Sequence, residues 1–409
     1  MDSLADRLRA LGVKRGAAAL PVPQRAEHFD IGAVLSGTIL QTELGETFVY
    51  EERFSADHRQ GEAPIRPAAA LRVVSAWAGD ARLGELPIES FAFLDTETSG
   101  LAGGTGTYAF LVGAARFVEG GEFVLQQFFM RDPTEEPALL DALGRFLAPA
   151  QALVTYNGKA FDAPLLSTRY LMHRMPNPMQ GFAHLDLLPL ARRLWRDRLE
   201  SRTLKYVEEK VLQAPRTLEE VPGYEIPSLY FEYLRTGDAR PLKGVFYHNA
   251  MDVVTLAALM SHTAGMLADP FHEGIEHGLD VIAMAKLYEQ LGEWETARRL
   301  FEKGLAMNVE EAHFWEALRR LAVLQKRRGD FEQAIPLWKQ AAAEGHVYAH
   351  VELAKYYEHK SHDAKKALEW TKAAVKELKD ADMPAYVRKY WDEELRRRRE
   401  RLEAKEKRG

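Results

Sequence analysis

Two carboxylates stand one residue apart at the end of a short apolar run, in the segment FAFLDTETSGL at residues 91–101. Residues two apart on a β-strand point to the same face, so Asp95 and Glu97 face one point. Two such acids repel each other unless a positive charge lies between them, and hard oxygen ligands suit Mg²⁺ or Mn²⁺. The segment therefore predicts metal-dependent chemistry at the end of a strand.

Length and composition are typical of a globular protein with several domains. At 409 residues the chain predicts two or three domains, because one domain averages roughly 150 residues. The absence of cysteine excludes thiolate metal sites, disulfides and a cysteine nucleophile. The first residues lack an apolar signal-peptide core, and no run of about 18 apolar residues occurs. We therefore expect a cytoplasmic protein with no membrane partner.

The order of strand and helix patterns predicts three regions. We expect an N-terminal accessory region at 1–88, which contains a hairpin-like pair of strands around Gly45. From 89 to 266, three strand patterns in quick succession are followed by strands that alternate with helices. That order predicts an α/β domain with a mixed five-stranded sheet and helices on both of its faces.

Helical hairpins with internal similarity predict a repeat domain at 275–409. Three segments align with Ala297, Ala334 and Ala367 in register, at offsets of 37 and 33 residues. Small residues at one helix crossing and aromatic residues at the next fit stacked helix pairs, and the pattern resembles tetratricopeptide repeats. The turn glycine is replaced near His362, so the third repeat is the least regular. The basic C-terminal helix fits either a solvated tail or a contact with nucleic acid.

Two further motifs carry acids that could join the first pair. YNGKAFDAPLL places Asp162 in the first turn of a helix, where a structural cap is an equally good explanation of a carboxylate. YHNAMDVVTLAAL places His248 and Asp252 four residues apart on an apolar helix. That spacing puts both side chains on one helix face, so both can point into one site.

The motifs LDTETSGL, YNGKAFD and HNAMD together resemble the exonuclease branch of the ribonuclease H-like superfamily, whose signature is four acids in the order Asp, Glu, Asp, Asp. Within it the chain is most similar to the YprB-type bacterial proteins, which are predicted exonucleases with helical repeats. The resemblance implies a ribonuclease H-like fold and 3′–5′ exonuclease activity on single-stranded DNA or RNA, through two Mg²⁺ or Mn²⁺ ions. It identifies four acids as catalytic metal ligands: Asp95, Glu97, Asp162 and Asp252.

A fifth catalytic residue in that superfamily is a histidine five positions before the last aspartate or a tyrosine four before it. Here Tyr247 stands at minus five and His248 at minus four, so each residue type occupies the other's position. A four-residue step is nearly in phase on a helix, whereas a five-residue step is not. This geometry favours His248 as the general base, and Tyr247 remains the alternative.

The resemblance also suggests which residues would hold the terminal nucleotide. Thr96, Thr98 and Leu101 surround the first motif, although core packing explains Leu101 equally well. Asn157 would position the sugar, and Phe161 would stack on a base.

A strip of six bases in fourteen residues includes Arg192 and Arg196, which fit contact with a phosphate backbone. Asp197 and Glu200 also allow a solvated, charge-balanced helix face.

Two other functions remain open. The accessory regions could convert the cleft to structure-specific or internal cleavage. Alternatively, the nuclease fold could be silent and serve as a scaffold whose repeats bind a protein partner. Four intact acids speak against a silent site, because their mutual repulsion is uncompensated without metal. Nothing in the motifs distinguishes DNA from RNA.

Overall fold

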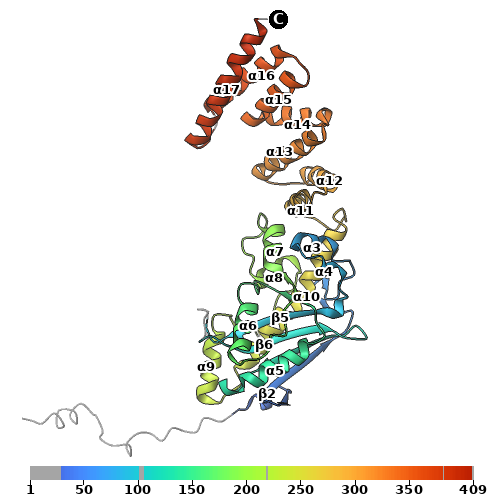
Figure 1. Cartoon of the computed structure of the whole chain (residues 1–409), viewed down its shortest axis with the longest axis vertical. Helices are drawn as coiled ribbons and strands as arrows, with labels where there is room; N and C mark the ends of the chain where they lie inside the picture. The colour runs from blue at the N-terminus through green and yellow to red at the C-terminus, as the bar shows by residue number, and fades with distance from the viewer. Residues whose placement is uncertain (1–28, 101–105, 218–219, 381, 408–409) are drawn as a thin grey trace, which may run out of the picture. The chain divides into compact units, whose positions relative to one another are not determined.

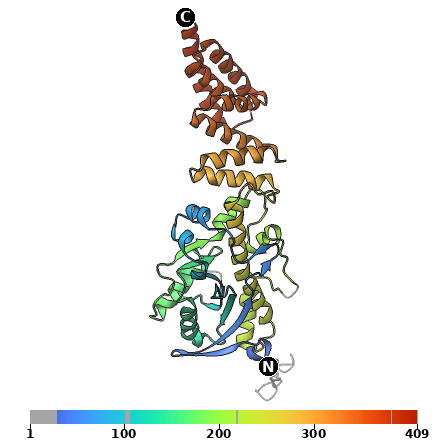
Figure 2. The ribbon, with the colours of Figure 1, turned by 90° about the vertical axis from the view of Figure 1, so that its right-hand side faces the viewer.

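The computed structural model describes residues 29–100, 106–217, 220–380 and 382–407. The chain forms two compact units that interleave along the sequence. We call Met1–Arg66, Leu86–Leu187 and Val211–Leu259 the sheet unit. We call Pro67–Glu85, Leu188–Lys210 and Met260–Gly409 the helical unit. Figures 1 and 2 show the strands of the first and the helical hairpins of the second.

A seven-stranded mixed sheet lies at the centre of the sheet unit. Its strand order is β1-β2-β7-β6-β5-β8-β9. Neighbouring strands are antiparallel from β1 to β5, whereas β8 and β9 run parallel to β5. The strands are β1 (Thr38–Thr42), β2 (Gly45–Phe54), β5 (Phe91–Thr98), β6 (Ala109–Phe117), β7 (Phe123–Phe129), β8 (Ala152–Thr155) and β9 (Ala183–Asp186).

The predicted mixed sheet is confirmed, but it is two strands wider than the five expected. The antiparallel series β5, β6 and β7 and the parallel strands β8 and β9 lie where the sequence pattern put them. The additional two strands are the predicted hairpin around Gly45, whose second strand β2 pairs with β7 from Phe48↔Phe129 to Phe54↔Phe123. This hairpin belongs to the same sheet and hides the β7 edge.

Helices cover both faces of the sheet. On one face, Phe146 of α5 (Glu136–Leu147) contacts Phe128 at a ring-centroid distance of 5.9 Å. On the other face, Phe246 of α10 (Leu242–Ala268) contacts Phe129 at 5.3 Å. Because Phe128 and Phe129 are adjacent on β7, their side chains point to opposite faces, and so the two helices lie on opposite sides of the sheet (Figures 1 and 2).

The remaining elements up to α10 are short. They are α2 (Ile31–Val34), β3 (Arg59–Gln60), β4 (Ala63–Pro64), α3 (Arg72–Ala78), α4 (Arg82–Glu85), η2 (Ile88–Ser90), η3 (Pro133–Glu135), α6 (Asp162–Met172), α7 (Leu187–Trp195), α8 (Leu204–Val211) and α9 (Ile226–Thr236). Among the described residues, α10 alone is long and apolar enough to cross a membrane, and 72% of its apolar window is buried inside the protein. Core helices of globular proteins pass the same test, so α10 is read as a core helix.

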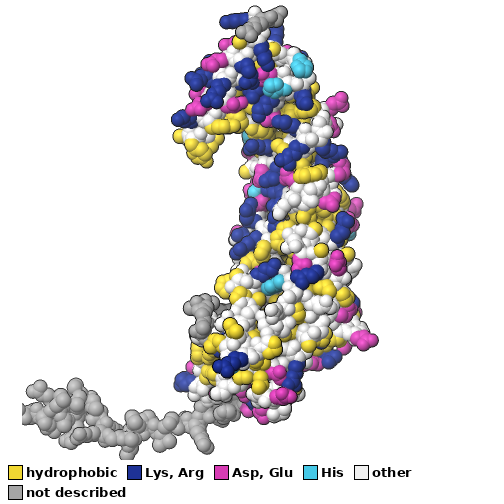
Figure 3. Space-filling view, viewed as in Figure 1, with side chains coloured by type: hydrophobic (Ala, Val, Ile, Leu, Met, Phe, Trp, Pro, Cys, Tyr) yellow, Lys and Arg dark blue, Asp and Glu magenta, His cyan; other side chains and the backbone are white. Residues whose placement is uncertain are grey.

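Helical hairpins follow α10, as the internal repeats predicted. They are α11 (Gly278–Gln290), α12 (Trp294–Leu305), α13 (Glu311–Arg328), α14 (Phe331–Ala343), α15 (Val347–His359), α16 (Ala364–Asp380) and α17 (Ala385–Glu406). The aligned residues Ala297, Ala334 and Ala367 are all 0% exposed. A larger side chain at these positions would hold the helices apart, which explains why each of them is alanine. Figure 3 shows acidic and basic side chains interspersed on the surface of these hairpins.

The turns between paired helices explain why the third repeat forms without its glycine. Gly292 and Gly329 both adopt φ of 80°, in the left-handed region that glycine tolerates. His362 takes φ of 54° at the matching turn between α15 and α16. The third hairpin therefore keeps the same turn and carries the backbone strain of a non-glycine residue there.

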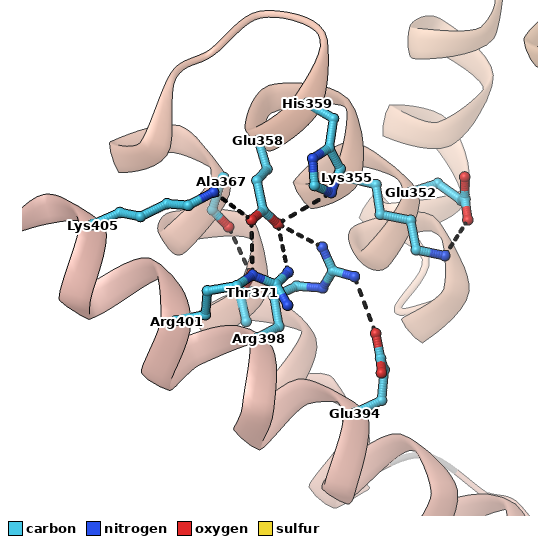
Figure 4. Close-up of polar contacts among 10 residues, drawn as sticks. All are labelled: Glu352, Lys355, Glu358, His359, Ala367, Thr371, Glu394, Arg398, Arg401 and Lys405. Carbon is cyan, nitrogen blue, oxygen red and sulfur yellow. Dashed lines mark hydrogen bonds and ion pairs between the residues drawn. The ribbon is translucent and has the colours of Figure 1, made fainter.

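The last helix is fixed to its neighbour by ion pairs. Arg398, Arg401 and Lys405 of α17 all donate to the carboxylate of Glu358 on α15, at 2.8 to 3.0 Å (Figure 4). The Glu358 side chain is 1% exposed. Arg398, Arg401 and Lys405 therefore stabilise the fold, and only the other basic residues of this segment are available to a ligand.

Candidate active site

Strand β5 directs Asp95 and Glu97 toward α10. Asp95 pairs in register with Gly113 and Glu97 with Leu111, so both acids lie on the sheet face that α10 covers. The side-chain amide of Asn249, on α10, donates a hydrogen bond of 2.9 Å to Asp95 Oδ2. The alternation of side chains along a strand therefore places both acids in one site, as predicted.

Gly113 allows α10 to approach the sheet at this point. A Cβ added at Gly113 would lie 2.2 Å from Asn249 Oδ1 and 3.0 Å from Val253 Cγ2. Because real side chains do not approach so closely, only glycine leaves room for Asn249 to reach Asp95. The lack of a side chain at Gly113 on β6 therefore allows the hydrogen bond between Asn249 and Asp95.

A buried amide pair holds Asn249 in position. Gln127 on β7 donates hydrogen bonds to Asn249 Oδ1 at 2.9 Å and to the Phe246 carbonyl at 2.8 Å. Both amide side chains belong to residues that are 0% exposed. Since a buried amide loses free energy if it is unpaired, these bonds fix the orientation of Asn249 and, through it, of Asp95.

Asp162 enters the site from the first residue of α6, which follows β8. The Thr96 hydroxyl donates a 2.5 Å hydrogen bond to Asp162 Oδ1, and Asp162 is 8% exposed. The turn before the helix is shaped by Asp186, whose carboxylate accepts from the backbone N–H groups of Asn157 (2.7 Å) and Lys159 (3.2 Å). Asn157 adopts φ of 67°, a conformation that asparagine tolerates better than most residues.

Helix α10 contributes His248 and Asp252. His248 Nε2 lies 3.6 Å from Asp252 Oδ2 and 4.0 Å from Glu97 Oε1. Tyr247 points elsewhere, because its hydroxyl accepts from the backbone N–H of Thr217 at 3.2 Å. The geometry therefore favours His248 over Tyr247 beside the acids, in line with the helical phase argument.

The acids perturb one another strongly. Burial, followed by repulsion from Asp252, Glu97 and Asp162, raises the pKa of Asp95 well above its ordinary value. Burial and the repulsion of Asp252 and Asp162 likewise raise the pKa of Glu97. Burial raises the pKa of Asp162 to about 6, against the opposing hydrogen bond from Thr96. Such shifts mark a cluster of negative charge that is incompletely neutralised.

The described cation that faces this cluster is Arg216, from the irregular segment between α8 and α9. Its guanidinium forms an ion pair with Asp252 and a second one with Glu220 at 3.0 Å. The Arg216 side chain is 2% exposed, and its charge opposes the increase in the pKa of Glu97. Glu220 Oε1 also lies 3.3 Å from His248 Nδ1, so an acid flanks the histidine on the side away from Asp252.

The carboxylate oxygens of the site are of the type that binds a hard divalent cation, but they are not arranged around a common point. The site brings together four carboxylates, and burial raises the pKa of three of them, Asp95, Glu97 and Asp162. Carboxylate oxygens are the ligands that Mg²⁺ and Mn²⁺ prefer. Within the described ranges, no three Asp, Glu or His side chains are grouped as ligands of one ion. Arg216 holds Asp252 Oδ1 in an ion pair, so a metal ion bound to that oxygen would have to displace the arginine.

The residues expected to contact the terminal nucleotide have mixed surroundings. Phe161 is 61% exposed and immediately precedes Asp162, so its ring is accessible. The Thr98 hydroxyl donates to the Gly100 carbonyl at 3.0 Å, and that of Thr96 is taken by Asp162. Leu101 lies outside the described residues.

Arg192 and Arg196 belong to the helical unit, where they line a pocket. Their position relative to the acids, which lie in the sheet unit, stays a prediction.

Asn249, Arg216 and Glu220 were not identified from the sequence. Asn249 carried a usable signal, because it stands three residues before Asp252 and therefore on nearly the same helix face. Arg216 and Glu220 carried none, because their segment has no periodicity from which a side-chain direction can be inferred.

Family models and a related protein agree with this architecture. The family model of the RNase_H superfamily matches residues 92–264, and a tetratricopeptide repeat model matches 281–312. The protein YprB of Bacillus subtilis (strain 168) is 37% identical over 296 residues, which are 71% of this chain and 69% of that protein. The family B DNA polymerase of Pyrobaculum calidifontis matches at 16% identity and a TM-score of 0.31, over 49% of this chain and 29% of that one. The chain therefore belongs to the YprB family, with an RNase H superfamily domain followed by tetratricopeptide repeats.

Proposed function

We propose that the protein is a metal-dependent 3′–5′ exonuclease that hydrolyses phosphodiester bonds of single-stranded DNA or RNA. The observation that carries the proposal is the convergence of four carboxylates from β5, α6 and α10 beside His248. Membership of a nuclease superfamily supports hydrolysis of nucleic acid. The polarity and the exonuclease mode rest on the motif resemblance.

The side chains around His248 suit it to accept a proton from the attacking water. Its Nε2 faces Asp252 and Glu97, while its Nδ1 faces Glu220. A proton on Nδ1, the nitrogen beside Glu220, would leave Nε2 free as the acceptor. Glu220 is then a positioning residue for the proposed base.

Asp95, Glu97, Asp162 and Asp252 would hold two Mg²⁺ or Mn²⁺ ions. When bound, such ions lower the pKa of water and offset the charge that develops on the leaving oxygen. The chain's own contribution is to fix these carboxylates: Asn249 holds Asp95, and Thr96 holds Asp162. A substrate base would stack on the exposed ring of Phe161, next to Asp162.

The test is digestion of 5′-labelled single-stranded DNA and RNA with Mn²⁺ or Mg²⁺, by the wild type, Asp95→Asn and Glu46→Gln. Glu46 is an exposed acid on β2 and serves as the matched control. We expect a ladder of shortening products from the wild type and Glu46→Gln, and a loss of about 10²–10³-fold or more for Asp95→Asn. In EDTA, Asp95→Asn should be at least as stable as the wild type, because it removes a repelled buried charge.

The product pattern decides between the alternatives. Internal fragments, or cleavage that persists with a blocked 3′ end, would replace the exonuclease with an endonuclease. The absence of metal-dependent cleavage on single-stranded and structured substrates would favour a silent scaffold. A protein partner for the repeats and a cytoplasmic location both stay predictions.

A further inference from the structure

A basic pocket of about 450 Å³ lies within the helical unit. Helices α3, α7 and α11 and the segment after α7 form its walls. Its lining residues come from sequence positions up to about 200 residues apart: Trp77, Pro189, Arg192, Arg193, Leu194, Arg196, Asp197, Arg202, Ala283, Lys286 and Gln290. The volume lies in the range of roughly 300–1,000 Å³ that small-molecule sites occupy.

The lining carries an excess of positive charge. Its bases are four arginines and Lys286, five in all, against the single acid Asp197, which leaves a net of four positive charges. Asp197 is shared, because it lies 3.3 Å from Arg196 and 3.4 Å from Lys286. Glu316, outside the lining, lies 3.0 Å from Lys286 and neutralises it further, so the arginines carry most of the excess positive charge.

Among the positively charged residues of the lining, Arg193 gives the strongest indication that the pocket binds a ligand. Its Nε is buried and has no hydrogen-bond partner among the described residues. Burial, followed by repulsion from the neighbouring Arg320, lowers the pKa of Arg193. The surroundings therefore destabilise the positive charge of this side chain. An anion in the pocket would supply the missing acceptor and offset this charge.

The other wall of the pocket is apolar and includes one aromatic ring. Trp77 on α3 is half-buried, and Pro189, Leu194 and Ala283 line the pocket with it. A pocket that combines arginines with an accessible indole matches the two parts of a nucleotide. Phosphate oxygens accept from guanidinium groups, and a nucleobase stacks on an aromatic face.

We propose that this pocket binds one nucleotide of single-stranded nucleic acid, with the phosphate at Arg192, Arg193 and Arg196 and the base against Trp77. The inference rests on the proposed nuclease function for its choice of ligand. It adds a second nucleic-acid contact that involves none of the proposed catalytic residues. The chain's net charge of −6 makes such a local basic site more necessary for holding a polyanion.

The first test measures binding without cleavage. The fluorescence anisotropy of a 5′-labelled single-stranded oligonucleotide is followed on the full chain in EDTA. We expect the double variant Arg192→Glu/Arg196→Glu to weaken binding by at least about tenfold, and to reduce the log–log salt slope by about 0.7 for each lost phosphate contact. The control Lys372→Glu/Lys376→Glu makes the same charge change at exposed positions of α16 and should weaken binding by less than about threefold. Equal effects of the two doubles would overturn the proposal.

The second test addresses the base. Trp77→Leu should weaken binding of the oligonucleotide by at least about fivefold, the effect of losing one stacked base. The same substitution should not weaken binding of an abasic oligonucleotide, and thermal unfolding verifies that the variant folds. If Trp77→Leu has the same affinity as the wild type for the normal oligonucleotide, the proposed base contact is wrong.

Competition identifies the ligand class. A poly-glutamate peptide that displaces the oligonucleotide at equal concentration would assign the pocket to acidic protein segments and contradict the proposal. A nucleoside monophosphate that binds as tightly as the oligonucleotide would assign it to free nucleotides, which also contradicts it. Because binding is measured in EDTA, these failures are separate from a failure of nuclease activity.

Discussion

At the scale of single residues, Arg216 defines the state of the acid cluster. Its guanidinium opposes the increase in the pKa of Glu97, and it pairs with Asp252 and Glu220. A divalent ion that binds Asp252 therefore competes with this arginine. The side chain is 2% exposed, so solvent does little to weaken the competing ion pair.

We predict that Arg216→Met increases the apparent affinity for Mn²⁺. Without the competing cation, the dissociation constant for Mn²⁺, obtained by fitting the melting temperature against Mn²⁺ concentration, should decrease by about tenfold, or about 1.4 kcal/mol. In EDTA the same variant should melt below the wild type, because Asp252 and Glu220 lose their partner.

The matched control for that experiment is Arg235→Met, because Arg235 is 71% exposed and pairs with Glu232 on the same helix. It should leave the Mn²⁺ response unchanged. An unchanged dissociation constant for Mn²⁺ in Arg216→Met would mean that Arg216 and the metal do not share Asp252.

The sequence predicted most of the site residues that lie on regular elements, with the exception of Asn249, and none of those on the irregular segment before α9. The alternation of β5 predicted that Asp95 and Glu97 share a face, and the helical repeat of α10 predicted the same for His248 and Asp252. Arg216 reaches the cluster from a segment without regular dihedral angles, where residue spacing carries no directional information. The catalytic roles of the acids and of His248 stay predictions.

At the scale of secondary-structure elements, the site depends on the close contact of β6 with α10. We predict that Gly113→Ala decreases the free energy of unfolding by about 1–3 kcal/mol, because its Cβ would overlap Asn249. It should also decrease nuclease activity, since Asn249 holds Asp95. Urea unfolding and the labelled-strand assay measure the two effects.

Gly265→Ala is the matched control, because this glycine lies on α10 and a Cβ there meets nothing within 4 Å. In a helix interior, alanine is favoured over glycine by up to about 1 kcal/mol, so this variant should be slightly more stable and fully active. If Gly113→Ala is as stable as Gly265→Ala, the proposed steric limit on α10 is wrong.

The ion pairs between α15 and α17 should make the last helix sensitive to acid. Burial alone would raise the pKa of Glu358, but hydrogen bonds from Arg401 and Lys405 outweigh it and lower the pKa to about 2. A lowered acid pKa gives stability that is complete above the unfolded value of about 4.3 and is lost as the pH falls toward 2. Glu358→Gln should remove this pH-dependent part.

At neutral pH, Glu358→Gln should decrease the free energy of unfolding of the last helices by about 3 kcal/mol. Buried Arg398 loses its partner, whereas Arg401 and Lys405 remain partly solvated. Hydrogen exchange of α15 to α17 measures the loss. Glu393→Gln, which removes an exposed pair with Arg397 on the same helix, should change exchange little. Equal protection in the two variants would contradict a stabilising role for the Glu358 ion pairs.

The third repeat shows where local sequence patterns were sufficient. The register of Ala297, Ala334 and Ala367 predicted three helix crossings, and all three are buried in the structure. The missing turn glycine near His362 lowered the regularity of the pattern but did not abolish the hairpin, because His362 adopts the left-handed conformation itself. Packing of the alanines outweighs a modest backbone strain.

At the scale of the whole molecule, long-range pairing set the limit of prediction. The hairpin around Gly45 was visible as local alternation, but its attachment to β7 joins segments about 75 residues apart. No local pattern encodes that choice of partner. For the same reason the basic pocket could not be foreseen, because Trp77, Arg192 and Lys286 meet only through the fold of the helical unit. The division at 1–88, 89–266 and 275–409 stays a prediction.

We expect the acid cluster to hydrolyse phosphodiester bonds only when a divalent ion is bound. The most direct test is the single-turnover rate of nucleotide release from single-stranded DNA and RNA, measured against Mn²⁺ concentration for the wild type and Asp252→Asn. We expect a wild-type rate that is zero in EDTA and saturates with Mn²⁺, and a loss of about 10²–10³-fold or more in the variant. Hydrolysis that persists in EDTA, or that is unchanged in Asp252→Asn, would contradict this expectation.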